Sequence, residues 1–374
     1  MTIKLENQFI CQFSIGPYED FILLEDLQEL KYIEYAGNVL PTIELQFILR
    51  NKDVVNYFNE GNILNVSLGR TQLDMIDLQF RLTDDDSTKN FSLGQNITLY
   101  GVLSLPEFTH KTKVKMWGKK TSIEVISELV KKYFIFKTNI NRTIDQQYFY
   151  QQNETDWEFL DEVWLHSYIN NKTFIALGFD CNTLFLKDIA KALESENPWT
   201  ITCNKISNEN SKIINIAGYV TSNSYGLAND IMGRNNIPLI TNSETGKESF
   251  LDYKSVSLSS IGTDKLNKMS SNNSNFLSFY NNSNVSSNYD TAFRQNLDNL
   301  LTYSNYRIVA QYAGQFKTLK VLDIVNLDND SFDERTCGKA FVTRIIYHLV
   351  NKKLMTNIMI CKEGPNDLKG ELKK

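Results

Sequence analysis

The chain has 374 residues, of which 42% are hydrophobic, and a net charge of -5 at pH 7. This length exceeds one ordinary core and predicts two to four domains. The mixed, slightly acidic charge argues against a nucleic-acid groove, and no apolar run approaches the roughly 20 residues that span a bilayer. Residues 1–10 lack the pattern of a signal peptide, so we expect a protein made and kept in the cytoplasm.

The cysteines are scattered singly, without a C-x-x-C pair or a nearby histidine. This spacing predicts reduced core thiols and no zinc set. They are Cys11, Cys181, Cys203, Cys337 and Cys361.

Alternating apolar and polar residues predict antiparallel β structure over residues 1–112. The apolar positions are Ile43, Leu45, Phe47 and Leu49; Leu64, Val66 and Leu68; Ile76, Leu78, Phe80 and Leu82; and Ile97, Leu99, Gly101, Leu103 and Leu105. Strands this short and closely spaced favour a closed or strongly curled barrel, which removes exposed sheet edges.

Two capping boxes predict helix starts at Thr121 and Thr155, because a Thr is followed three residues later by a Glu in each. Apolar residues at helical spacing follow each box, namely Ile126, Leu129, Val130 and Tyr133 after the first and Trp157, Leu160, Val163 and Trp164 after the second. An extended Asn/Gln/Tyr-rich connector joins the two helices. The chain then predicts a hairpin with strands 173–179 and 183–187.

Strand patterns return from Pro198, at 199–203 and 214–216, and a loop is expected at 221–224. Over 226–289 the pattern fades, and the Ser- and Asn-rich stretch 267–289 is typical of a loose loop. Strands resume only near residue 302, after a helix at 291–303. A final strand pair is expected at 341–350 and 354–360.

The order of these features resembles the central baseplate hub of large contractile-tailed bacteriophages. The same order is found in the N-terminal hub region of type VI secretion spike proteins and in late-control tail proteins. The string at 152–160, Gln-Asn-Glu-Thr-Asp-Trp-Glu-Phe-Leu, matches the start of that family's second helix, and 290–297 with 310–314 matches the approach to its closing barrel.

The resemblance implies an α+β, mainly β chain with two similar antiparallel β-barrels, a small helix/hairpin domain and an insertion. The implied boundaries are 1–112 for the first hub barrel, 113–197 for the α+β domain, 198–225 with 290–362 for the split second barrel, 226–289 for an insertion domain or long loop, and 363–374 for a charged tail.

The resemblance also implies a non-enzymatic structural subunit of the virion tail, assembled in the host cytoplasm. It would form a homotrimeric ring that adapts a sixfold tail tube to a threefold spike. Expected partners are a tail-spike or tail-lysozyme protein below, tail-tube or tube-initiator proteins above, and baseplate wedge proteins around it. DNA would only pass through the lumen, and no membrane insertion or cofactor is expected.

Candidate catalytic residues are few, since the three histidines stand far apart in the sequence. His166, in the last turn of the second helix, is expected to be a capping or surface residue whose cation complements the helix dipole. His348 is expected within a barrel strand. His110 is expected to be solvated in a basic linker, 110–115.

Two acidic stretches, 84–86 and 328–331, have partial calcium-loop character but lack the central Gly, so solvated turns are favoured. The dense basic run at 111–120 includes Trp117 and could touch a phosphate backbone, but it more simply marks a domain junction. Gly-rich phosphate loops are absent from the sequence. We therefore assign no catalytic, cofactor or metal residues, and the sequence does not identify partner-binding residues.

Three alternatives remain open. The chain could be the hub of a type VI-like contractile injection system. It could be a tail-associated cell-wall hydrolase, because its 44 acidic residues offer many carboxylate pairs. It could also be a barrel that binds oligosaccharides or nucleic acid, although the acidic balance disfavours the latter.

Overall fold

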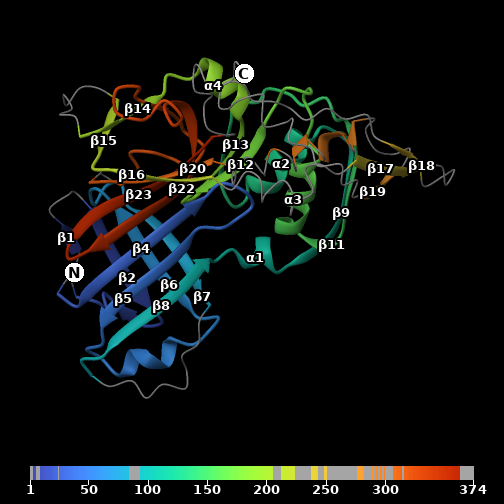
Figure 1. Cartoon of the computed structure of the whole chain (residues 1–374). Helices are drawn as coiled ribbons and strands as arrows, with labels where there is room; N and C mark the ends of the chain where they lie inside the picture. The colour runs from blue at the N-terminus through green and yellow to red at the C-terminus, as the bar shows by residue number, and fades with distance from the viewer. Residues whose placement is uncertain are drawn as a thin grey trace.

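The architecture comes from a computed structural model of the whole chain, in which strands dominate (Figure 1). The structure describes residues 3–5, 9–23, 25–83, 93–204, 212–223, 237–242, 248–250, 276–281, 288–289, 291–293, 295–296, 299, 306–313 and 316–362. Within these residues no helix is both long enough and apolar enough to cross a bilayer.

The N-terminal part of the chain folds as an antiparallel sheet in the order β1-β2-β6-β7-β8-β5-β4. Its elements are β1 (Ile3–Leu5), β2 (Phe9–Ile15), β3 (Tyr18–Glu19), β4 (Leu27–Tyr35), β5 (Thr42–Ile48), the 3₁₀ turn η1 (Asp53–Tyr57), β6 (Ile63–Gly69), β7 (Ile76–Leu82), β8 (Asn96–Leu103) and the short helix α1 (Pro106–Thr109). The four strands predicted from alternation are confirmed as β5 to β8. Their apolar positions are largely buried and the residues between them are more exposed, as expected for a half-buried sheet.

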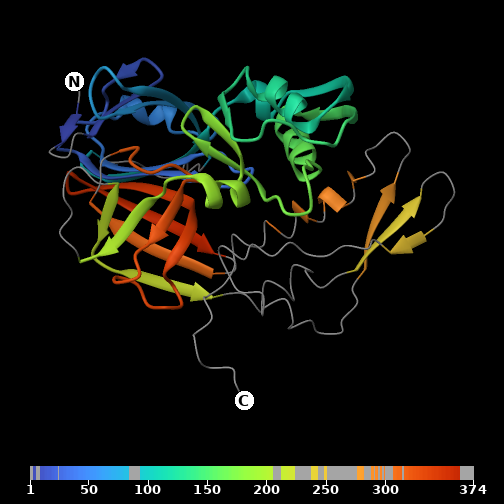
Figure 2. The ribbon, with the colours of Figure 1, turned by 90° about the horizontal axis from the view of Figure 1, so that it is seen from above.

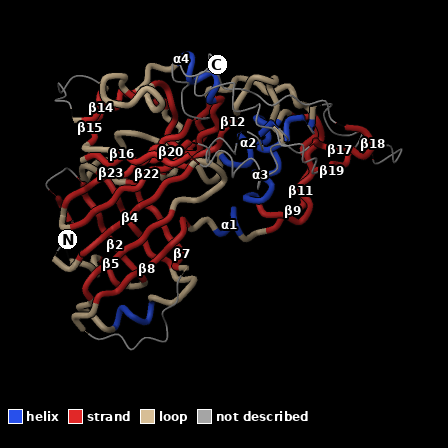
Figure 3. Tube along the Cα trace, viewed as in Figure 1, coloured by secondary structure: helices blue, strands red, loops and turns tan. Residues whose placement is uncertain are grey.

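The middle of the chain holds most of the helix. Its elements are β9 (Thr112–Lys120), α2 (Ser122–Val130), β10 (Ile135–Thr138), β11 (Gln147–Thr155), α3 (Asp156–Leu165), β12 (Ile175–Asp180), β13 (Thr183–Asp188) and α4 (Ile189–Ser195). The two capped helices and the β12–β13 hairpin are confirmed. Figure 3 shows α2 and α3 gathered to one side of the long sheet.

The basic linker was a wrong prediction, because most of it belongs to strand β9, whereas the connector between the two helices is extended and contains β10 and β11. β9 and β11 pair as an antiparallel ribbon, and β10 runs parallel to β13. In β9 the lysines alternate with Val114 and Met116, whose side chains are 84% and 59% exposed. The usual pattern of buried apolar and exposed polar residues is therefore missing from this strand.

The C-terminal part returns to strands. They are β14 (Trp199–Cys203), β15 (Ile213–Ile216), β16 (Tyr219–Asn223), β17 (Ile237–Asn242), β18 (Glu248–Phe250), β19 (Phe276–Asn281), β20 (Tyr306–Tyr312), β21 (Ile324–Leu327), β22 (Gly338–Val350) and β23 (Lys353–Lys362). The predicted final strand pair is confirmed as β22–β23. The residues described within the predicted helix, 291–303, are helical as far as 299.

Two predictions in this part were wrong. Thr221, Ser222 and Asn223 belong to β16, which pairs with β20, and not to a loop. As the outer strand of its sheet, β16 needs a backbone partner on one side only and tolerates exposed polar side chains. The second wrong prediction was that strands resume only near residue 302. In the structure, β17, β18 and β19 form a small sheet within 226–289.

A long strand pair joins the two ends of the chain. β4 and β22 run antiparallel from Glu29 opposite Val350 to Tyr35 opposite Arg344. This pairing merges both halves into one 15-stranded sheet, and Figure 2 shows the two strand layers side by side. The mainly β, α+β fold class is confirmed. Although β15 contacts β20, the described pairings do not close either half into a ring of strands, so the two similar barrels stay a prediction.

Aromatic side chains fill the core where the halves meet. Tyr32 of β4 and Tyr347 of β22 stack with ring centroids 6.1 Å apart, and Phe316 meets Tyr347 edge-on at 4.7 Å. All three residues are nearly inaccessible to solvent. Their burial ties the N-terminal sheet to the segment that follows β20.

Candidate functional site

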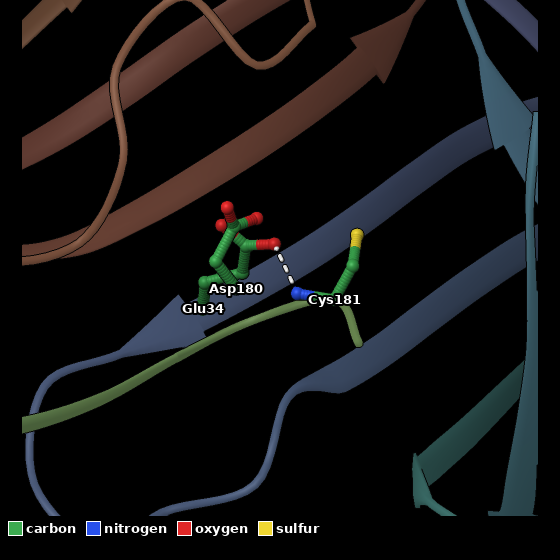
Figure 4. Close-up of side chains that lie close together, drawn as sticks. All are labelled: Glu34, Asp180 and Cys181. Carbon is green, nitrogen blue, oxygen red and sulfur yellow. Dashed lines mark hydrogen bonds between the residues drawn. The ribbon is translucent and has the colours of Figure 1, made fainter. Parts of the chain in front are cut away.

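A buried group of charged and polar side chains lies where three distant segments meet (Figure 4). Glu34 comes from β4, Asp180 ends β12, Cys181 follows it in the β12–β13 turn, and Lys317 follows β20. We call these four residues the junction cluster. Possible ligand atoms of the first three lie within 4.8 Å of one another, and all three residues are buried.

The backbone brings these groups together. Ala36 forms an isolated bridge with Gly178 of β12, and the Gly37 amide donates to the Leu177 carbonyl at 2.7 Å. Gly178 is needed at this point because a Cβ would lie 3.0 Å from Val321 Cγ1. At the turn itself, Cys181 adopts a φ of 48° and its amide donates to Glu34 Oε1 at 3.0 Å.

Lys317 supplies a cation to both carboxylates of the junction cluster. Its Nζ lies 3.0 Å from Glu34 Oε1 and forms an ion pair with Asp180, while the Lys320 ammonium lies 3.9 Å from Asp180 Oδ2. Burial lowers the pKa of Lys317, and the Glu34 carboxylate opposes that shift. Two carboxylates and two ammonium groups balance one another, so the cluster acts as a buried ion-pair network.

The Cys181 thiol is a poor nucleophile and a poor metal ligand. Burial raises its pKa well above the ordinary value, with a further contribution from Glu34. The Tyr32 hydroxyl donates to its Sγ at 3.2 Å. Because the thiolate is the reactive and ligating form, and Lys317 occupies the cationic position, this donor set does not fit a metal centre.

A second polar group holds the β9–β11 ribbon on the helices. Lys113 forms an ion pair with Asp156, whose Oδ2 also accepts from Tyr133 at 2.8 Å and whose Oδ1 accepts from Gln151 at 3.0 Å. Burial raises the pKa of Asp156, but these hydrogen bonds lower it more, so the net pKa falls. Asp156 therefore both opens α3 and anchors the ribbon.

Three further lysines of the basic run are also engaged. Lys111 pairs with Glu107 at 3.4 Å, Lys120 pairs with Glu128, and Lys115 lies 4.2 Å above the Trp117 ring. These contacts leave little free positive charge for a phosphate backbone. They support the interpretation of this run as a junction.

Both capping boxes have the expected form. At Thr155 the Glu158 amide donates to Thr155 Oγ1 at 3.2 Å, and the Thr155 amide donates to the Glu158 carboxylate at 2.8 Å. At Thr121 the backbone amide donates to Glu124 at 2.8 Å. Asp156 and Glu158 stand in the first turn of α3, where negative charge suits the helix end.

His166 caps the end of α3 but not as a cation. Its ring stacks on Tyr289 at 3.7 Å and on Phe293 at 5.0 Å, and its Nδ1 lies 2.8 Å from the Glu162 carbonyl. Burial lowers its pKa to about 4. The capping position is as expected, whereas the stacking and the lowered pKa favour a neutral ring over the cation that would complement the helix dipole.

The other two histidines lie in separate elements. His348 is in β22, as predicted, with Nε2 2.6 Å from Glu29 Oε1. His110 follows α1 and is exposed, with Nε2 2.6 Å from Arg81 Nη1. The geometry therefore gives each histidine a different local partner and does not bring the three together.

The two acidic stretches have different outcomes. Residues 84–86 lie outside the described part of the chain. At 328–331 the Ser331 hydroxyl donates to Asp328 Oδ2 at 2.8 Å, and the Phe332 amide donates to the Asp328 carbonyl at 3.0 Å. This is a self-capped turn.

The cysteines in the structure are all free. Cys11, Cys181 and Cys361 are buried, whereas Cys203 and Cys337 are only half-buried. None of the five forms a disulfide, and the prediction of core positions holds for three of them.

The sequence did not point to the junction cluster. Asp180, Cys181 and Asn182 were predicted as a hairpin turn, where a charged residue is usually exposed. Glu34 and Lys317 lie 147 and 136 positions from Cys181, and no local pattern links such positions. An acidic residue at a strand end beside a cysteine was the only available signal, and it is weak.

Comparison with solved structures gives a fold match over nearly the whole chain. A tail protein from Neisseria meningitidis MC58 matches with a TM-score of 0.55 at 10% identity, over 95% of this chain and 96% of that chain. The 43 kDa tail protein of prophage MuSo2 from Shewanella oneidensis matches with a TM-score of 0.54 at 9% identity, over 94% and 98%. This chain has a phage tail-protein fold.

A component of the E. coli type VI secretion system also matches, with a TM-score of 0.50 at 9% identity over 94% of this chain and 76% of that chain. That component is described as similar in structure to the T4 bacteriophage tail proteins gp27 and gp5. No family model matches the sequence, and no curated protein matches it. The resemblance to tail hub proteins is thus confirmed at the level of fold.

Proposed function

We propose that the protein is a structural baseplate hub subunit of a contractile phage tail. The observation that carries this proposal is the end-to-end fold match, because both tail proteins are covered over at least 96% of their own length. A match over only part of each chain would also be expected for a single shared domain in proteins with different roles. A match from end to end supports a chain that serves as the same kind of part.

In this proposal the subunit forms a homotrimeric ring whose barrels sit at 1–112 and at 198–225 with 290–362. Three chains with two barrels each present six similar units to the tail tube and three to the spike. The α+β domain at 113–197, the insertion at 226–289 and the tail at 363–374 complete the layout. The β4–β22 pairing supports such a design, since it fixes both halves of one chain in a continuous sheet.

The proposed partners are tube or tube-initiator proteins above, a spike or tail-lysozyme protein below, and wedge proteins around the ring. DNA passes only through the lumen, and the assembly resides in the virion tail. The proposed role is non-enzymatic. The engaged, separated histidines and the protonated Cys181 thiol support this part of the proposal.

The test is the solution mass of the purified chain by light scattering, followed by negative-stain images along the symmetry axis. We expect a trimer and an open ring with six lobes. A stable monomer that also fails to bind the tube and spike proteins encoded beside it would remove the proposal.

The hub of a type VI-like injection system is the second candidate, and the match to the E. coli secretion component favours it. Genes for capsid and terminase beside this one would decide for a phage. A cell-wall hydrolase predicts falling turbidity of a peptidoglycan suspension on addition of the protein, and we expect none.

A further inference from the structure

One strand of the N-terminal sheet is only partly paired. β7 pairs with β6 from Ile76 to Arg81, but its ladder with β8 covers only Phe80, Arg81 and Leu82. The Ser104 amide adds one bond, to the Gln79 carbonyl at 2.6 Å. Beyond that bond, the described residues place no strand beside β7 on the β8 side.

The backbone of Asp77 faces this open side. Leu82 exchanges hydrogen bonds with Gly61 and Asn62, on the β6 side of the strand. Backbone groups alternate in direction along an antiparallel strand, so Gln79 and Asp77 point the other way. The Ser104 bond to Gln79 agrees with this direction. Asp77 thus presents an N–H and a C=O to the gap.

A cavity with a volume of about 540 Å³ lies at this gap. Leu103, Leu105 and Phe134 give it an apolar lining, and Asn182 of the β12–β13 turn and residues 65–67 of β6 also line it. An open strand edge on one side and an apolar wall on the other are the two features of a site for strand addition. The edge binds a backbone, and the cavity takes the side chains that point inward.

The negative charge of Asp77 favours extended peptides that carry a basic residue. Asp77 is the only charged residue that lines the cavity, and its side chain lies on the exposed face, where Oδ1 accepts from Ser67. A residue opposite Asp77 on an added strand would project onto the same face. A basic residue complements the carboxylate there, and its two neighbours would project to the opposite face, on the side of the buried Leu78, which also lines the cavity.

We propose that the free edge of β7 binds an extended segment of another protein, in which apolar and basic side chains alternate. The added strand runs along Asp77 and Gln79 and buries its apolar residues in the cavity. This inference does not depend on the hub proposal, since strand addition would serve any assembly in which this chain takes part.

The test uses fluorescein-labelled peptides, acetyl-Val-Lys-Val-Lys-Val-amide and its Glu counterpart, with fluorescence polarisation on the full chain. We expect the Lys peptide to bind better than the Glu peptide. Asp77→Asn should weaken Lys-peptide binding about two- to fivefold, as for an exposed ion pair. Asp77→Lys should reverse the preference. A version of the Lys peptide with a central proline should not bind, because it cannot complete the ladder.

Asp77→Pro tests the backbone contact directly. It removes the N–H that faces the gap and leaves the β6–β7 ladder intact, so we expect Lys-peptide binding to fall more than about tenfold. Leu73→Pro, at a 99% exposed turn residue, is the matched control. If Asp77→Pro does not fold, the reversal by Asp77→Lys still decides the question.

Two results would overturn the inference. The first is the absence of peptide binding by the wild-type chain, or binding that neither Asp77→Pro nor Asp77→Lys changes. The second is a change in the solution mass of the chain with Asp77→Pro, which would assign this edge to a second copy. A monomeric wild-type chain that binds the Lys peptide but fails to bind the tube and spike proteins encoded beside it would contradict the hub proposal alone.

Discussion

The junction cluster and the two helix caps use similar chemistry over very different distances along the chain. In each cap a Thr and a Glu three positions apart satisfy one helix end. In the junction cluster, Glu34 receives a hydrogen bond from Cys181 and a cation from Lys317, 283 positions away. In each cap the Thr is buried but its Glu partner is exposed to solvent, whereas Glu34 is completely buried.

The comparison teaches that the cost of losing a polar contact depends on burial. A capping residue that is lost exposes its amide to water, which replaces part of the bond. Loss of the Lys317 cation leaves the buried carboxylates of the junction cluster without a counter-charge, and water cannot replace it. The junction cluster should therefore dominate the sensitivity of this protein to substitution, and four variants test that ranking.

Lys317→Met should have the largest effect. It leaves Glu34 and Asp180 buried without their main counter-charge, and we expect a loss of about 3–5 kcal/mol in the free energy of unfolding. Urea denaturation measures it. Lys320→Met is the control, because that ammonium lies 3.9 Å from Asp180 and is 38% exposed. Equal losses from the two variants would mean that the cluster does not hold the junction.

Gly178→Val should come next. Its side chain would collide with Val321 and Leu322 and push β12 away from the C-terminal half, at a cost of about 1–3 kcal/mol. The shift of the thermal midpoint measures the effect. Gly118→Val, in the exposed ribbon, meets only Tyr148 at 3.7 Å and should leave the midpoint nearly unchanged. If Gly178→Val had the same thermal midpoint as the wild type, the packing around residue 178 would be able to accommodate the larger side chain.

Thr155→Ala should cost about 1 kcal/mol, because it removes the acceptor for the Glu158 amide at the start of α3. Urea denaturation of this variant beside Thr155→Ser, which keeps the hydroxyl, gives the measurement. If Thr155→Ala lowered the free energy of unfolding as much as Lys317→Met does, local and distant contacts would not differ in their contribution to stability.

The last effect should be one of pH at His166, and it appears only below pH 6.5. Its folded pKa of about 4 lies below the ordinary 6.5, so the unfolded chain takes up the proton first. Stability from this group is complete above pH 6.5 and falls as the pH drops from 6.5 toward 4. His166→Phe keeps the ring stack and should flatten this part of the profile in thermal melts. His348→Gln is the control and should not flatten the pH profile in the same way. Identical pH profiles for the wild type and His166→Phe would contradict the assignment of this pH dependence to His166.

The sequence predicted those elements whose signal is local. Strands β5 to β8 follow strict alternation, and α2 and α3 follow from their caps. β9 was missed because Val114 and Met116 are exposed to solvent, and β16 because an edge strand needs no apolar pattern. The junction cluster could not be predicted, since no periodicity reports that positions 34, 180 and 317 will meet.

The pairing of β4 with β22 has a consequence for synthesis of the chain. At 5–20 residues per second, β22 leaves the ribosome roughly 15–60 s after β4. During that interval, the edge of β4 that β22 will cover is open, as are the aromatic faces of Tyr32 and its neighbours. We expect the nascent protein to depend on holding chaperones, and truncated chains that end before β22 to aggregate.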